Sequence, residues 1–356
     1  MHLSHTEIPK EYKSHISRKV FFIIGGLIAL CLVFLFSISV GAVTVPVTDL
    51  IAAIAGRSID TKWHIIIWNI RMPQALTAVV GGAGLAVAGA MMQSILRNPL
   101  GSPFTLGISH AAAFGAALSV MLFTPGSISD SVINAAGIVS PYTTALIAFI
   151  ASLVATGIII AISRIRQASP EVMVLTGVAL GSLFTAGTMF LQYFADDVQL
   201  AAMVFWTFGD VGRANWNELS LMCIVLIGLI VYGFWNRWNY NAIDAGDDTA
   251  KGLGVHVSHV RLWGMLAASF MTAVIVAFLG VIGFVGLDCP HMVRRLIGDD
   301  YRFLLPGTCI AGGLLLLTAD TAARLIMAPH ILPVSILTAF LGAPVFIYLI
   351  IRGTGR

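Results

Sequence analysis

Charged side chains are rare in this sequence, so the groupings that could support chemistry are few. Asp320 and Arg324 lie four residues apart in an apolar segment, a spacing that places an acid and a base on one face of a helix. They form either a structural ion pair that lowers the cost of both charges in a membrane, or a docking site in which Asp320 orients an outward-facing Arg324. Arg71, just before Met72 and Pro73, has the same two interpretations, with snorkelling as the structural one.

Histidine and cysteine offer little further chemistry. His110 lies in the apolar stretch LGISHAA without an acid at helical spacing, which favours packing over a ligand or proton-relay role. Cys289 and His291 are two residues apart, and side chains at that spacing diverge in a helix, so we expect no metal site. No acids or histidines cluster in the apolar segments, and no G-x-x-x-x-G-K-[ST] motif occurs. The sequence therefore predicts neither an enzyme nor an ATP site.

A polar interruption at 241–256, NAIDAGDDTAKGLGVH, lies between two long apolar runs. Asp247 or Asp248 can cap a short helix there, and Ala250 and Leu253 would share one of its faces. Glycines that follow can end this helix. The segment is therefore a candidate docking surface, and an ordinary solvated loop is the alternative.

Composition sets the class of protein. Of 356 residues, 58% are hydrophobic and only 10% are charged, whereas a soluble domain carries roughly 25% charged residues. This deficit predicts a polytopic membrane protein. The net charge of +3, without a basic run interleaved with aromatics beyond the N-terminal segment, does not indicate a nucleic-acid partner. The four cysteines occur singly, which indicates neither a disulfide framework nor a zinc site.

Windows of about 20 apolar residues predict an all-α fold with ten membrane spans. These spans are 19–41, 73–96, 104–124, 142–163, 172–193, 218–236, 261–281, 283–297, 303–326 and 334–352. The organisation is then a polar N-terminal segment, 1–18, followed by one transmembrane domain, 19–356. Ten spans place both termini on one side, which would carry 15 of the 20 lysines and arginines. The positive-inside rule therefore predicts that both termini and segment 241–256 are cytoplasmic.

A faint internal repeat accompanies these spans. Gly89 and Pro99 are ten residues apart at the end of the second span, and Gly280 and Pro290 repeat this spacing at the end of the seventh. Because these two spans would run in opposite directions, the sequence predicts an inverted repeat of spans 2–5 and 7–10. The alternative is that glycine and proline are common in membrane helices. The small residues at 81–90, GGAGLAVAGA, predict a tightly packed helix.

Several segments in a fixed order resemble the FecCD family, the permease subunits of bacterial and archaeal ATP-binding-cassette (ABC) importers for iron–siderophore complexes, haem and cobalamin. They cover the chain from about Arg71 to its C-terminus. The segments are RMPQALTAVVGGAGLAVAGAMMQSILRNPLGSPFTLGIS (71–109), VLTGVALG (174–181), DAGDDTAKGLGV (244–255), FLGVIGFVGLDCPHMVRRLIGDDYRFLLP (278–306), LLTADTAARL (316–325) and LPVSILTAFLGAPVFIYLI (332–350).

The resemblance implies roles for particular residues. The family's loop that couples to the ATPase is matched here by Gly246, Asp247, Asp248, Ala250, Leu253 and Gly254. Arg71 and Arg324 match the family's arginines that meet the binding protein. The family's R-x-P-R pattern, however, reads Arg71-Met72-Pro73-Gln74 here, so its second arginine is missing. The cytoplasmic gate would involve Asn98, Leu100, Ser169 and Glu171. The pathway would involve Met173, Thr176, Gly177, Met189, Thr338 and Phe340.

The implied function is import of a metal chelate, with an iron(III)–siderophore complex as the first expectation. Haem, cobalamin and molybdate or tungstate are alternatives within the family, and an ion-gradient-driven secondary transporter is the alternative from another class. The expected partners are two cytoplasmic ATPases carrying ATP and magnesium, an extracytoplasmic binding protein, a second copy of the chain and membrane lipid. No cofactor or metal is expected in the chain itself, and its expected location is the cell membrane.

Overall fold

The computed structural model describes residues 10–41, 43–57, 60–123, 141–165, 170–327 and 330–353. Within these ranges the regular elements are helices, and the only β-type pairing is an isolated bridge between Phe208 and Val281. In chain order the helices are α1 (Lys10–Ser39), α2 (Val47–Ile54), α3 (Thr61–His64), η1 (Ile65–Arg71), α4 (Met72–Leu96), α5 (Ile108–Phe123), α7 (Pro141–Ile165), α8 (Pro170–Phe194), α9 (Asp197–Thr207), η2 (Val211–Arg213), α10 (Trp216–Trp235), α11 (Arg237–Asp244), α12 (Asp247–Gly252), α13 (Val257–Leu279), α14 (Val285–Ile297), α15 (Tyr301–Ile326) and α16 (Val334–Gly353).

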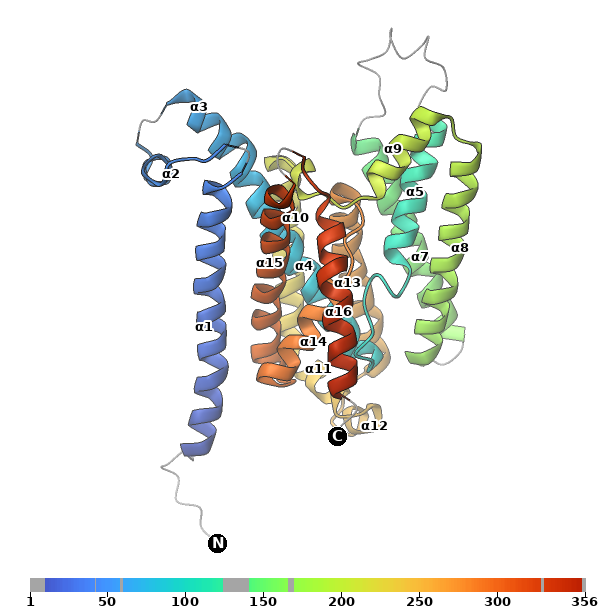
Figure 1. Cartoon of the computed structure of the whole chain (residues 1–356). Helices are drawn as coiled ribbons and strands as arrows, with labels where there is room; N and C mark the ends of the chain where they lie inside the picture. The colour runs from blue at the N-terminus through green and yellow to red at the C-terminus, as the bar shows by residue number, and fades with distance from the viewer. Residues whose placement is uncertain are drawn as a thin grey trace.

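The helices form a central bundle with a group of helices on either side (Figure 1). The centre is α4, which packs against α10, α13, α14 and α15. At one edge α1 packs mainly on α15, and at the other edge α5 packs on α7 and α8. The start of α1, the end of α16 and the short helices α11 and α12 lie at one end of the bundle, and α2 and α3 lie at the other. Among the described residues, the start of α1, the end of α16 and segment 241–256 therefore share one end of the bundle, as the predicted topology requires.

Small residues allow α4 to occupy the centre. A Cβ atom added to Gly82 would lie 2.2 Å from the carbonyl oxygen of Gly312, and one added to Gly89 would lie 1.7 Å from that of Gly286. Only hydrogen fits at these contacts, so backbones approach one another directly. The tight packing predicted from the composition of 81–90 is therefore confirmed.

The described residues contain seven helices that are long and apolar enough to cross a membrane, with shorter apolar helices at Ile108–Phe123 and Val334–Tyr348. The predicted span 283–297 contains a shorter helix than expected, although the chain crosses the bundle here, from Leu279 beside Gly81 of α4 to Tyr301 beside Asn241 of α11. The helix in this region, α14, has only 13 residues and rises about 20 Å, which is short of the roughly 30 Å of hydrocarbon in a bilayer. Gly280 is the C-cap residue of the preceding helix, α13, and Gly298 is the C-cap residue of α14; both have positive φ.

The glycine–proline spacing does not mark equivalent positions in two repeats. Gly89 lies inside α4 and Pro99 follows the end of that helix, whereas Gly280 caps α13 and Pro290 lies inside α14. The predicted equivalence of the two glycine–proline pairs is therefore wrong, because α4 continues for seven residues beyond Gly89. The antiparallel course of α4 and α13 is nevertheless clear, since Gly81 in the first half of α4 packs on Leu279 at the end of α13, and Ile95 near the end of α4 packs on Gly264 in the first half of α13.

We predict that Gly89→Ala lowers the free energy of unfolding by about 1–3 kcal/mol, because the new methyl group must displace the backbone of α14. Denaturant titration of the purified protein in detergent measures this change. Gly228→Ala is the matched control, since a Cβ at that exposed position in α10 meets nothing within 4 Å. Equal stability of the two variants would contradict the close packing of α4 and α14.

Candidate functional site

The short helix α12 begins with a glycine. Gly246, at φ +127°, is its N-cap residue and provides no capping side chain. The prediction that Asp247 or Asp248 caps the helix is wrong, because both acids lie in its first turn. There they still complement the partial positive charge of the helix N-terminus.

The two apolar residues of α12 face different ways. Ala250 is fully buried, whereas the Leu253 side chain is 70% exposed. The prediction that they share one face is wrong because the helix ends at Gly252, and Leu253 belongs to the turn that follows. That turn closes through Gly254 at φ +83°. We call Asp248, Lys251 and Leu253, which are all exposed, the α12 face.

A buried arginine ties α12 to the central helix. Arg261, at the start of α13, pairs with Asp247 at 2.8 Å between Nη2 and Oδ1, and its Nε donates a hydrogen bond of 2.9 Å to the carbonyl oxygen of Ile95. Only 7% of the Arg261 side chain is exposed. Arg97, which ends α4 in a left-handed conformation, lies 4.0 Å from the same carboxylate. Asp247 and Arg261 therefore link α12 directly to the end of α4.

A second ion pair joins α11, α4 and α14 behind this contact. Arg294 lies 3.2 Å from Asp244 and 3.1 Å from Asp299. The hydroxyl of Ser94 donates a hydrogen bond of 3.0 Å to Asp244. Burial raises the pKa of Asp244, and Arg294 and Ser94 oppose this rise by stabilising the carboxylate. Sequence reasoning missed Arg261 and Arg294 as site residues, because partners far apart along the chain leave no local pattern.

The turn after α4 borders a polar pocket of ≈ 530 Å³ at the same end. Its lining includes Arg97, Asn98, Asn241, Asp244, Arg294 and Asp299. Asn98 accepts a hydrogen bond of 2.9 Å from the backbone N–H of Leu100, which is itself exposed. These two predicted gate residues therefore lie beside the α12 linkages. Of the other two, Glu171 is exposed in the first turn of α8, and Ser169 lies outside the described residues.

The predicted pathway residues divide into packed and exposed groups. Met173, Gly177 and Thr338 are buried, Thr176 is half-buried, and Met189 and Phe340 are exposed. Gly177 packs against the loop before α5, since a Cβ there would lie 2.6 Å from the Cα of Leu106. Met189 lies on α8 at one edge of the bundle, whereas Phe340 lies on α16, which packs on α14 and α15. The structure of one chain therefore does not gather all six residues into a single cavity.

His110 lies at a pocket of ≈ 480 Å³ between α5 and α8, which Met189 also lines. Its ring centroid is 4.7 Å from that of Phe104. The buried Nδ1 atom has no hydrogen-bond partner among the described residues. The ring contact with Phe104 supports the packing role predicted for His110.

Both predicted docking arginines are buried, at 7% exposed for Arg71 and 9% for Arg324. Arg71 donates hydrogen bonds to the carbonyl oxygens of Ile38, Ser39 and Val43, and Arg324 donates one to the Ser37 hydroxyl. These acceptors lie at and just beyond the end of α1, where carbonyl groups lack helical partners. The structural interpretation of both arginines is therefore favoured, and neither guanidinium faces outward in this arrangement.

The predicted pairing of Asp320 with Arg324 is confirmed, with 3.0 Å between Oδ2 and Nε. Gln74 donates a hydrogen bond of 2.9 Å to the other carboxylate oxygen of Asp320. This is the position at which the sequence departs from R-x-P-R. A glutamine there satisfies the carboxylate without adding a second buried positive charge.

The helices and this arrangement of charges define a multi-pass membrane protein. The FecCD transport family matches residues 28–352, so the chain belongs to that family. A Methanocaldococcus jannaschii protein described as an ABC transporter permease is 50% identical over 346 residues, covering 97% of this chain and 98% of the relative. The chain is accordingly a permease subunit of an ABC transporter and is not itself catalytic.

Two further comparisons agree with this assignment. The hemin transport system permease protein HmuU of Yersinia pestis is 39% identical over 293 residues, which cover 82% of this chain and 85% of the relative. A solved structure described as an inward-facing conformation of a metal-chelate type ABC transporter superposes with a TM-score of 0.80. It is 28% identical and covers 93% of this chain and 98% of its own.

We predict that Arg261→Gln releases α12 without unfolding the bundle. The variant loses the charged hydrogen bond to Asp247, so the backbone amides of 246–255 should exchange with deuterium about tenfold faster. Hydrogen–deuterium exchange with mass spectrometry measures this effect. Lys251→Gln is the control, because it removes only the exposed pair with Asp248, which contributes little. Unchanged exchange in Arg261→Gln would show that α12 is held by other contacts.

We also predict that Arg324→Met lowers the free energy of unfolding by about 3–5 kcal/mol, since Asp320 would stay buried without its cation. The double variant Asp320→Asn, Arg324→Met should lose less than the two single variants added together. Denaturant titration of the four proteins gives the coupling energy. Strict additivity would show that the pair does not interact in the folded protein.

Proposed function

We propose that this chain is the membrane subunit of an ABC importer for metal chelates, coupled to its ATPases through the α12 face. The observation that carries the proposal is the connection from this exposed surface through Asp247 and Arg261 to the backbone of Ile95. A subunit without a phosphate-binding loop needs energy from a partner, and this connection provides a route for it. Family membership and the relatives' names support the same conclusion.

The proposed mechanism is alternating access driven by nucleotide binding and hydrolysis in two cytoplasmic ATPases, which bind ATP and magnesium. Their motion would move α12, and the buried Arg261 would pass this motion to α4, which contacts most of the central helices. Coupling requires that different nucleotide states of the ATPases favour different arrangements of the permease helices. Asn98, Leu100, Ser169 and Glu171 remain the proposed gate, because Asn98 lines the polar pocket next to this route and accepts a hydrogen bond from the backbone of Leu100.

A second copy of the chain would complete the pathway in this proposal. Met189 and Phe340 are exposed on separate helices of one chain, so facing surfaces of two copies could bring such residues together. The antiparallel packing of α4 and α13 supports the proposed inverted relation of the two halves. Both termini would be cytoplasmic, and an extracytoplasmic binding protein would dock at the end that carries α2 and α3. Docking at Arg71 or Arg324 would require them to leave the end of α1.

An iron chelate is the proposed cargo. An iron(III)–siderophore complex remains our first candidate, and the name of the Yersinia pestis relative supports haem as the second. Cobalamin and molybdate or tungstate are further candidates. The ion-gradient alternative is less favoured, because Asp320, the acid that the sequence offered for it, is paired with Arg324 and hydrogen-bonded to Gln74.

Uptake into vesicles tests the proposal. Vesicles containing the permease, its ATPase and its binding protein should accumulate an iron chelate when ATP is supplied without an ion gradient. Uptake that needs a gradient and not ATP would overturn the proposal and favour a secondary transporter. Competition among ferric siderophores, haem, cobalamin and molybdate would identify the cargo.

We predict that Leu253→Asp weakens ATPase association about tenfold or more, because truncating or charging a central apolar contact removes much of an interface's binding energy. Co-purification and ATP-driven uptake should fall together while the permease still inserts. Ile51→Asp is the matched control for ATPase association, since this exposed residue of α2 lies at the opposite end of the bundle. Full ATPase association in Leu253→Asp would contradict a coupling role for the α12 face.

A further inference from the structure

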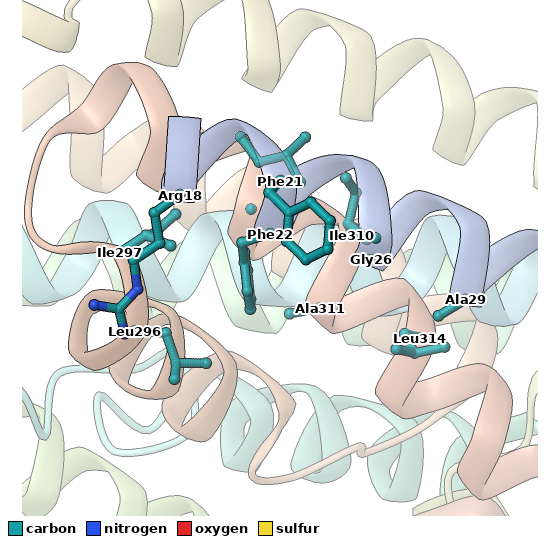
Figure 2. A pocket seen from close by; sticks show the side chains of 13 residues that line it. Arg18, Phe21, Phe22, Gly26, Ala29, Leu296, Ile297, Ile310, Ala311 and Leu314 are labelled. Atoms are coloured by element: carbon teal, nitrogen blue, oxygen red, sulfur yellow. The ribbon is translucent and has the colours of Figure 1, made fainter. Parts of the chain in front are cut away.

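A lateral groove of ≈ 440 Å³ runs between α1 and the helices α14 and α15 (Figure 2). Its walls are almost entirely apolar, with Phe22, Gly25, Gly26 and Ala29 on α1 and with Ile310 and Leu314 on α15. The site described above lies elsewhere, around α12. This groove is unrelated to the ATPase surface and needs its own explanation.

Adjacent glycines create the groove. At Gly26 the two helices are close, since a Cβ there would lie 3.1 Å from Cγ2 of Ile310. At the preceding residue, Gly25, there is open space, because a Cβ atom there would meet nothing within 4 Å. The rest of α1 faces outward with large apolar side chains, such as Phe21, Ile28 and Leu32, which are all more than half exposed. The groove therefore opens sideways toward the hydrocarbon of the bilayer.

One end of the groove is positively charged. Arg18 lines it there, and Figure 2 shows the Arg18 side chain directed toward Leu296 and Ile297 at the end of α14. Among the residues that the structure describes, the Arg18 side chain makes no hydrogen bond or ion pair. The neighbouring Lys19 is buried, with its Nζ 5.3 Å from the ring centroid of Phe303. Asp300, the nearby acid at the start of α15, is already paired with Arg302.

The length of the groove matches one leaflet. From Arg18 to Ala29 the α1 lining covers eleven helical steps, which rise about 17 Å. The hydrocarbon of one leaflet is about 15 Å thick, half of the roughly 30 Å core. An acyl or isoprenoid chain that begins beside Arg18 would therefore end near the bilayer midplane.

We propose that this groove binds an anionic phospholipid from the leaflet on the α12 side of the membrane. One hydrocarbon chain lies between α1 and α15 over Gly25, and the phosphate group lies against Arg18. A cation at the headgroup level and an apolar slot of leaflet length are complementary to this one ligand class. The bound lipid fills the space that packing between α1 and α15 leaves open.

Native mass spectrometry tests the proposal on the full-length protein released from nanodiscs that contain equal amounts of phosphatidylglycerol and phosphatidylcholine. The wild-type protein should retain phosphatidylglycerol in preference to phosphatidylcholine. Gly25→Leu should lose the retained lipid of either kind, because the new side chain fills the slot. Arg18→Gln should keep a lipid and reduce the preference for phosphatidylglycerol about fivefold, since one surface cation contributes about that factor.

Gly228→Leu on α10 is the matched control, because a Cβ at this exposed helical glycine also meets nothing within 4 Å. It should leave lipid retention unchanged. Equal retention in Gly25→Leu and Gly228→Leu would overturn the site, and an unchanged preference in Arg18→Gln would overturn the anionic assignment. A loss of self-association in Gly25→Leu, with lipid retained, would show that a second copy of the chain covers the groove instead.

Discussion

Direct backbone contact around α4 is the constraint on which the rest of the structure depends. In a membrane the hydrophobic effect does not drive one apolar helix onto another, so close van der Waals packing must do so. Gly82 against Gly312 and Gly89 against Gly286 bring α15 and α14 to the surface of α4 without intervening side chains. The other central helices take their places around this unit, and a shift of α4 must therefore be shared among them.

Four largely buried arginines stabilise the two ends of this packed unit in different ways. At the α2 and α3 end, Arg71 and Arg324 satisfy carbonyl groups where α1 stops, which fixes a helix that otherwise stands at the edge. At the other end, Arg261 and Arg294 join short polar helices to α4. A guanidinium suits both tasks, because its several donors can serve backbone and carboxylate acceptors at once. The second pair is next to the exposed α12 face, so the same chemistry that stabilises the fold also provides a route for coupling.

The α1 edge follows another principle. Arg71 and Arg324 hold the end of α1, and Gly26 lets its middle touch α15, yet Gly25 leaves an apolar slot beside that contact. A water-soluble protein would fill such a slot with side chains, whereas a membrane protein is surrounded by chains that can enter it. In our proposal a lipid chain fills this slot and completes the packing at the α1 edge, just as buried water completes the packing of soluble proteins.

Composition and local pattern by themselves determined that this is an all-helical membrane protein, that 81–90 packs tightly, that Asp320 pairs with Arg324, and that 241–256 contains a short helix. Each of these depends on neighbours along the chain or on the overall balance of apolar residues. Only the tertiary structure decided that α14 is only 13 residues long, that Arg71 and Arg324 bind the end of α1, and that Arg261 connects Asp247 to Ile95. These features join residues from different helices, and a hydrogen bond between distant segments leaves no period or spacing in the sequence.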